Sequence, residues 1–337
     1  MDRVIFPPSL SARALSVFST RLNERCGISA IEIDFGESRW GTPFWFLLAA
    51  SHINQFRAKS PTTRLSCSNY GHLGYPAHIG FFQAFGLPYG NAPGAISGND
   101  NYVPITVLPC ADLRIEADRQ GINVGELIEE RASRLAHILC RGANDAVLET
   151  LTYCMREIMR NVVEHSETDR IAFCAQFWPA RKCVEVGIND WGIGLRESLQ
   201  RNPELSAATD ADALRLALMP GVSGKGAIVK RLRHRTPWTN SGYGLYMTSR
   251  ICRKAGSFLI GSGSAALQLS QSTEASAPWD HTGTAVRLEL GVGNLDAISV
   301  ALERFRREAD EFCRAFPREE RMSASLASRM LARDFSQ

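Results

Sequence analysis

Short stretches of alternating apolar and polar residues occupy the first third of the chain, and longer apolar runs that begin or end at Pro or Gly separate them. The alternating pattern is typical of half-buried strands and the longer runs of helices. Because strands separated by helices favour a βαβ arrangement, we expect residues 1–110 to form a small α/β unit. The predicted strands are 30–35, 62–67 and 101–108, and the predicted helices are 43–56 and 77–85, the second ending before Gly86.

Longer helical patterns follow in the rest of the chain. Residues 123–139 combine apolar spacings of three and four with early acidic residues, which predicts an amphipathic helix within a connecting segment, 111–144. An apolar stripe predicts a helical tail over 292–337, with a short helix after Pro317. The elements predicted between these are helices 145–165 and 245–254, strands 170–177, 183–189, 258–269 and 285–290, and a polar loop at 270–281.

Length and composition limit the classes of protein that fit these patterns. The 337 residues suggest about two domains, and 45% hydrophobic with 22% charged residues is ordinary for a folded protein. A net charge of +3 is too small to indicate nucleic acid or a membrane surface as partner. Residues 1–8 do not resemble a secretory signal, and no apolar run approaches the roughly 20 residues of a membrane span. Nine cysteines without a CxxC pair favour a reducing compartment, so we expect a cytoplasmic protein.

Polar motifs interrupt the second half of the chain in a fixed order. The first recurs every four residues in a helical run, so its members share one helix face. The second is an acidic turn after an apolar strand, where glycines let a flat ligand approach the backbone. The third is a glycine pair at a helix start, where N–H groups suit an anion. These motifs are Glu157, Asn161 and His165; Asp190, Gly192 and Gly194; and Gly242, Gly244 and Leu245.

These motifs, followed by Thr282-Gly283-Thr284, resemble the N, G1 and G2 boxes and last conserved strand of the gyrase, chaperone, histidine-kinase and mismatch-repair (GHKL) ATPase superfamily. The resemblance covers residues 145–291. It implies an α/β sandwich with helices on one face of a mixed sheet, and it implies ATP and Mg²⁺ as ligands. By resemblance, Asn161 is the Mg²⁺ ligand, Glu157 orients or deprotonates the attacking water or hydroxyl, and Asp190 accepts from the adenine amino group.

The resemblance also implies a lid over the nucleotide at residues 195–241. The lid carries a basic, glycine-containing run in which Lys225 lies between two glycines, and we expect this lysine to contact phosphate. Thr284 would support the adenine end through its hydroxyl group. The implied nucleotide-binding residues are Asp190, Gly192, Gly194, Lys225, Gly242, Gly244, Leu245 and Thr284.

The branch of the superfamily and its activity stay open. An Asn161-x-x-x-His165 pattern occurs in anti-sigma-factor kinases and in histidine kinases, which are the closest resemblances. Slow ATP hydrolysis that drives a lid-based switch is the leading hypothesis. The alternatives are a serine/threonine protein kinase of the anti-sigma type and a nucleotide-sensing module without turnover. His137 lacks the acidic residue and Pro expected after a phosphoacceptor histidine, so we interpret it as an ordinary helical residue.

Residues 1–110 resemble a STAS domain, the fold of anti-anti-sigma factors. The resemblance depends on residues 33–35 before a helix and on residues 79–87. The phosphorylatable Ser of that family has no counterpart at the matching position, where Thr42 precedes Pro43. We interpret Thr42 as a helix N-cap. We expect a protein partner at the STAS-like unit or the C-terminal helix, leave a homodimer open, and expect neither nucleic acid nor a membrane as partner.

Overall fold

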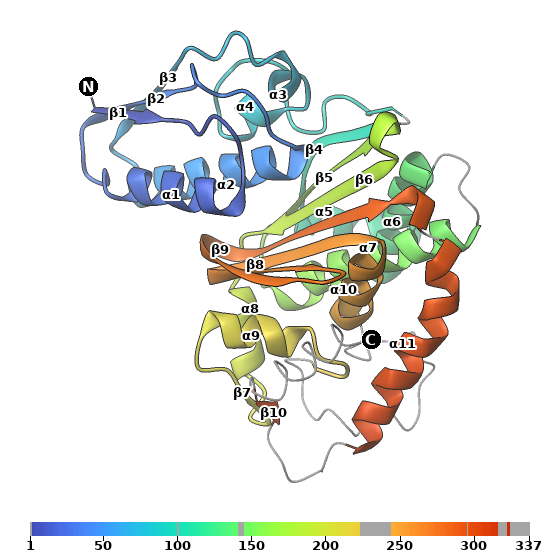
Figure 1. Cartoon of the computed structure of the whole chain (residues 1–337). Helices are drawn as coiled ribbons and strands as arrows, with labels where there is room; N and C mark the ends of the chain where they lie inside the picture. Colours follow the sequence, from blue (N-terminus) through green and yellow to red (C-terminus); the bar gives the residue numbers. More distant parts are fainter. Residues whose placement is uncertain are drawn as a thin grey trace.

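The computed structural model describes residues 2–99, 101–140, 145–222, 244–294, 296–315 and 322–323 (Figure 1). It contains a three-stranded parallel sheet, a five-stranded antiparallel sheet and a two-stranded pair. The fold is therefore α/β, as predicted. Each helix in the described ranges is too short or too polar to span a bilayer.

The three-stranded sheet is built from two successive βαβ units. Its strands lie in the order β1-β2-β3 and all run parallel, which confirms the predicted βαβ arrangement. The first strand was not predicted, because Asp2-Arg3-Val4-Ile5 does not alternate between polar and apolar residues, and the first helix was not predicted either. The elements are β1 (Asp2–Ile5), α1 (Ala12–Asn23), β2 (Ala30–Asp34), α2 (Pro43–Lys59) and β3 (Arg64–Ser68).

The helix predicted over 77–85 is two short helices, α3 (Gly74–His78) and α4 (Phe81–Ala84). Gly80 lies between them with φ +92°, a left-handed conformation that interrupts the helical hydrogen-bond ladder. The break turns the aromatic side chains of α4 into the core of the N-terminal unit, where Phe81 contacts Phe6 and Phe35.

The strand predicted over 101–108 belongs to the other sheet. β4 (Tyr102–Pro109) pairs antiparallel with β5 (Arg170–Trp178), with Tyr102 opposite Gln176 and Pro109 opposite Arg170. The alternation of side chains identifies a strand but not its neighbours, so the sequence could not show this pairing. Through β4, the N-terminal segment supplies one edge of the five-stranded sheet.

The five-stranded sheet has the order β4-β5-β6-β9-β8, and each neighbouring pair is antiparallel, so the expected mixed sheet is wrong. β6 is Cys183–Asp190, β8 is Gly256–Ser270 and β9 is Glu274–Gly291. The polar loop predicted at 270–281 is also wrong. Most of it is the first half of β9, because the β8–β9 hairpin turns over residues 271–273 alone.

Helices cover both faces of the five-stranded sheet (Figure 1). On β6, Val184, Val186 and Ile188 pack into the core formed with the later helices. The opposite face meets α2: the Phe44 N–H donates to Glu185 Oε1 (3.2 Å), and a Cβ on Gly187 would lie 2.8 Å from the Phe44 ring. The later helices are α5 (Cys110–Gln120), α6 (Val124–Cys140), α7 (Asp145–His165), α10 (Gly244–Ala255) and α11 (Asp296–Ala315).

The segment expected to be a lid begins with ordered elements. α8 (Gly194–Gln200) is followed by β7 (Leu205–Ser206) and α9 (Asp210–Ala217). β7 pairs in parallel with β10 (Met322–Ser323), which lies where a short helix was predicted after Pro317. Two short 3-10 helices, η1 (Pro179–Arg181) and η2 (Val292–Asn294), complete the described elements. Residues 223–243, which include the predicted site residues Lys225 and Gly242, lie outside the described ranges.

Thr42 occupies the predicted N-cap position but its side chain does not cap the helix. α2 begins at Pro43, while Thr42 Oγ1 is buried and, among the described residues, has no hydrogen-bond partner. By contrast, Thr209 forms a capping box with Asp212 at the start of α9. A hydroxyl that is 97% buried is also closed to a protein kinase unless this helix end opens, since Thr42 is 3% exposed.

We therefore expect opposite results from the same substitution at the two helix starts. Thr209→Ala should lower the free energy of unfolding by about 1 kcal/mol, the usual contribution of a hydrogen-bonded cap. Thr42→Ala should leave it unchanged or raise it, because the substitution removes a buried hydroxyl without a partner. Urea denaturation of both variants measures the difference. If Thr42→Ala lowered the free energy of unfolding by about 1 kcal/mol, the Thr42 hydroxyl would be a cap of α2 after all.

Candidate functional site

The C-terminal end of α7 lies directly against the turn that follows β6. The main-chain oxygen of Ser166 accepts a hydrogen bond from the Ile193 N–H at 2.9 Å. A Cβ on Gly192 would lie 1.8 Å from that same oxygen, so only glycine fits this approach. The first two predicted motifs, whose nearest members His165 and Asp190 are 25 residues apart in sequence, are thus on elements that touch.

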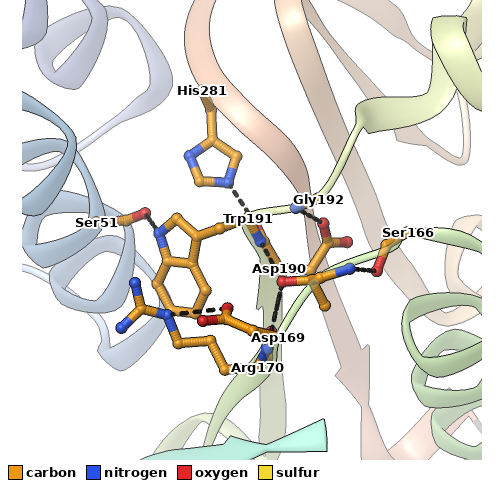
Figure 2. A network of polar contacts seen from close by, with 9 residues as sticks. Ser51, Ser166, Asp169, Arg170, Asp190, Trp191, Gly192 and His281 are labelled. Atoms are coloured by element: carbon orange, nitrogen blue, oxygen red, sulfur yellow. Dashed lines mark hydrogen bonds and ion pairs between the residues drawn. The ribbon is translucent and has the colours of Figure 1, made fainter. Parts of the chain in front are cut away.

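Asp190 ends β6 and its side chain is buried at the centre of this contact (Figure 2). Its Oδ1 accepts from the Gly192 N–H at 2.8 Å and from the Thr284 N–H at 3.2 Å. Burial raises the carboxyl pKa to about 6, and the two N–H groups oppose that shift. Both described hydrogen bonds go to Oδ1, which leaves Oδ2 as an acceptor for a ligand N–H group.

The predicted Thr282-Gly283-Thr284 motif meets Asp190 from β9. Thr284 contributes its main-chain N–H to the carboxylate, whereas the sequence had suggested its hydroxyl as the functional group. Gly283 has φ +93°, and a Cβ there would lie 2.4 Å from the Asp190 main-chain oxygen. Gly283 therefore combines a left-handed backbone with a close approach, and both require glycine.

Two glycine substitutions separate these requirements. Gly27 has φ +86° but open space around it, so Gly27→Ala should cost only the left-handed strain of about 1 kcal/mol. Gly283→Ala should cost about 2 kcal/mol more, because Asp190 or the β9 backbone must also shift. Thermal unfolding of the two variants checks this order. Equal destabilisation would mean that β9 moves away from Asp190 at no cost.

Glu157 on α7 lies against the first residue of α10. A Cβ on Gly244 would lie 2.5 Å from Glu157 Oε2 and 2.9 Å from Glu157 Cβ, so the N and G2 motifs are also in contact. Glu157 Oε1 pairs with Arg156 Nη2 at 3.2 Å, and Arg156 Nη1 pairs with Glu129 at 3.3 Å. A pairing with a neighbouring arginine is also what a purely structural role of Glu157 would give, whereas the packing on Gly244 belongs to the contact between α7 and α10.

The remaining predicted site residues lie on the helices α7, α8 and α10. Asn161, one helical turn after Glu157, is partly exposed. Gly194 has φ +76° and begins α8, and Leu245 on α10 packs at the edge of the core. His165 ends α7, but its side chain lies outside what the structure describes.

The histidines that suggested other chemistry have ordinary settings. His72 hydrogen-bonds the main-chain oxygen of Ser38 at 2.9 Å, and His78 hydrogen-bonds the hydroxyl of Tyr102 at 2.7 Å. His137 is exposed on α6.

Two residues that hold this turn were not identified from the sequence. The indole N–H of Trp191 donates to Ser51 Oγ on α2 at 2.6 Å, and the Arg170 guanidinium lies 4.8 Å from the Trp191 ring centre (Figure 2). His281 Nε2 hydrogen-bonds the main-chain oxygen of Asp190 at 3.0 Å. Burial lowers the pKa of His281 to about 4, so the ring is neutral near pH 7. His281 was placed in a polar loop, and only the pairing of β8 with β9 brings it to the turn.

A cavity of about 310 Å³ borders the same turn on the side of α9 and the β8–β9 hairpin. Its lining includes Gly194, Gly283 and Ser262, together with Asp210 and Trp279. Asp190, Asn161 and Glu157 are not among the residues that line it. The hollow therefore reaches the neighbours of Asp190, Gly283 and His281, but its lining does not include the carboxylate or the polar face of α7.

Compared with protein-family models and with curated proteins, the chain matches none of them.

Proposed function

We propose that this protein binds ATP with Mg²⁺ in the manner of the GHKL superfamily and hydrolyses it slowly to drive a conformational switch. The supporting observation is that four motifs separated in sequence meet. Ser166 at the end of α7 contacts Ile193, Asp190 accepts from Thr284, and Gly244 packs on Glu157. These contacts link polar groups of α7, the turn after β6, β9 and α10, and a few converging polar groups are what orients a ligand in a binding site.

The turn after β6 suits the adenine end of the nucleotide. Asp190 Oδ2 is the acceptor available to an exocyclic amino group, and the charged form is the better acceptor. With a pKa of about 6, the carboxyl is mostly ionised at pH 7.5. Gly192 and Gly194 pack closely on Ser166 and Ser262, and this packing holds the turn beside the Asp190 carboxylate.

The polar face of α7 suits the phosphate end. The Asn161 amide oxygen is a ligand type that Mg²⁺ accepts alongside phosphate oxygens and water. When bound, Mg²⁺ would neutralise charge on the phosphates. Glu157 would orient the attacking water, and the N-terminal N–H groups of α10 at Gly244 would face the phosphates. Lys225 and Gly242, outside the described ranges, complete the proposed contacts.

Incubation with γ-labelled ATP and Mg²⁺ tests the proposal against its alternatives. Release of labelled phosphate by the wild type, lost on chelation of Mg²⁺, is the expected result. Label transferred to a protein partner would instead identify a serine/threonine kinase. Binding without release or transfer would identify a nucleotide sensor, and absence of binding in calorimetry would overturn the proposal itself.

The N-terminal unit is the proposed output of the switch. It resembles a STAS domain in sequence, and its α2 packs on the back of the same sheet whose front carries the proposed site. A protein partner would bind this unit or α11, with a second copy of the chain as one alternative for that partner.

A further inference from the structure

A continuous chain of hydrogen bonds links α2 of the N-terminal unit to the turn at Asp190. Gln55 Nε2 lies 3.0 Å from His281 Nδ1, and His281 Nε2 lies 3.0 Å from the Asp190 main-chain oxygen. One helical turn earlier, Ser51 accepts from the Trp191 indole at 2.6 Å. α2 therefore holds two consecutive residues of the turn, Asp190 and Trp191.

The bonding partners define how His281 is protonated. A main-chain carbonyl only accepts hydrogen bonds, so His281 Nε2 carries the proton and donates to Asp190. Nδ1 of the neutral ring then accepts from the Gln55 amide. Both partners are needed to fix the ring, because rotation of His281 would break one bond or the other.

Each step of the path from Gln55 to Asp190 is hydrogen-bonded, whereas other buried polar atoms nearby, among the described residues, have no partner. Among the described residues, both side-chain amide atoms of Asn189, next to Asp190 on β6, are buried and have no hydrogen-bond partner. His52 is on α2, three residues before Gln55, and its ring centre lies 6.1 Å from that of His281. General satisfaction of buried polar groups thus does not explain why the path to Asp190 is bonded at each step.

We propose that His281 is a positioning residue for the nucleotide site, through which Gln55 on α2 sets the place of Asp190 and couples the N-terminal unit to nucleotide affinity. The inference rests on the proposed function, since it assigns a route of regulation to that site. Coupling of this kind is reciprocal, so nucleotide binding also changes how firmly α2 is held.

Gln55→Ala tests the route, with Asn54→Ala as the matched control. Asn54 is the neighbouring amide on α2, also partly buried, but it bonds the Ala84 main-chain oxygen within the N-terminal unit. We expect Gln55→Ala to weaken ATP binding by about 5- to 10-fold, the usual size of such coupling. Hydrogen exchange at the Gly192 and Thr284 amides, without nucleotide, should be faster by a similar factor. Asn54→Ala should change neither quantity.

A second variant separates positioning from a general loss of packing. In Gln55→Glu the new carboxylate can only accept, so His281 must carry protons on both nitrogens to keep both bonds. The Asp280 carboxyl on β9 favours the charged form of this ring, and Asp190 acts on it through its main-chain oxygen. His52 on α2 is neutral at pH 6 to 8, because burial lowers its pKa to about 3. Relative to the wild type at each pH, this variant should bind ATP about 10-fold more weakly at pH 8 and regain affinity at pH 6.

The outcomes distinguish this inference from the function on which it rests. If the wild type binds ATP while Gln55→Ala and Asn54→Ala behave alike, or if Gln55→Glu shows the wild-type pH profile, the route through His281 is wrong and the ATP site stands. If the wild type does not bind ATP, the proposed function fails and the inference fails with it.

Discussion

Glu157→Gln is expected to lower the rate of ATP hydrolysis by about 100- to 1000-fold, the usual contribution of a group that orients or deprotonates the nucleophile. ATP affinity should change by less than about threefold, because the amide keeps the shape of the side chain and its packing on Gly244. Single-turnover release of labelled phosphate measures the first quantity and calorimetry the second.

Glu129→Gln is the matched control, since Glu129 shares the Arg156 guanidinium with Glu157. Each substitution removes one carboxylate from the same arginine, but only Glu157 packs on α10. We expect Glu129→Gln to keep the wild-type rate within about twofold, as for an exposed ion pair. Equal losses in both variants would assign the effect to Arg156 and would remove Glu157 from the proposed chemistry.

The sequence predicted the helices and strands whose position is determined by residues close to one another in the chain. α7 and α2 begin where expected, because the apolar spacing along both helices and Pro43 at the start of α2 are properties of neighbouring residues. β6 ends one residue later than predicted, at Asp190, and the acidic glycine turn follows it. Local patterns of this kind are the ones a single sequence carries most strongly.

The errors concern information that is not local. β4 was assigned to the first unit because nothing in its alternation names β5 as its neighbour. The first half of β9 was taken for a loop because its polar residues are typical of loops, yet pairing with β8 makes them a strand. Both errors come from tertiary pairing that overrides the local pattern.

The residues of the candidate site also divide into those that the local sequence identifies and those that only the tertiary structure identifies. Asp190, Glu157 and Asn161 could be identified because polar residues at a strand end or on one helix face stand out. His281 and Gln55 could not, because they reach Asp190 only after β9 pairs with β8 and α2 packs on the sheet. The packing of the N-terminal unit on the back of the sheet is what brings these two residues to Asp190.

Asp190 is the residue at which stability and function should oppose each other. The folded pKa of about 6 lies above the ordinary value of 3.8, so the folded state favours the protonated carboxyl. The ionised carboxyl therefore destabilises the fold above about pH 6, and this cost disappears as the pH falls below about 4. A shift of about two pKa units corresponds to about 3 kcal/mol.

Asp190→Asn should accordingly raise the free energy of unfolding at pH 8, by up to about 3 kcal/mol, and change it little at pH 4. The amide oxygen can still accept from Gly192 and Thr284, while the charge is gone. ATP affinity should fall by about 10- to 100-fold, because the amide presents N–H donors to the donor group of adenine. Urea denaturation at the two pH values and calorimetry with ATP measure the two effects.

Asp210→Asn is the control, because the Asp210 carboxylate accepts hydrogen bonds within the fold and has no proposed contact with ATP. Asp210 also accepts a main-chain hydrogen bond, from Ser264 N at 2.8 Å, but it is partly exposed at the start of α9. Its substitution should give no gain of stability at pH 8 and no loss of ATP affinity. If Asp190→Asn instead lowered stability and left ATP affinity unchanged, the buried carboxylate would be a structural part of the turn, and the proposed adenine contact would be wrong.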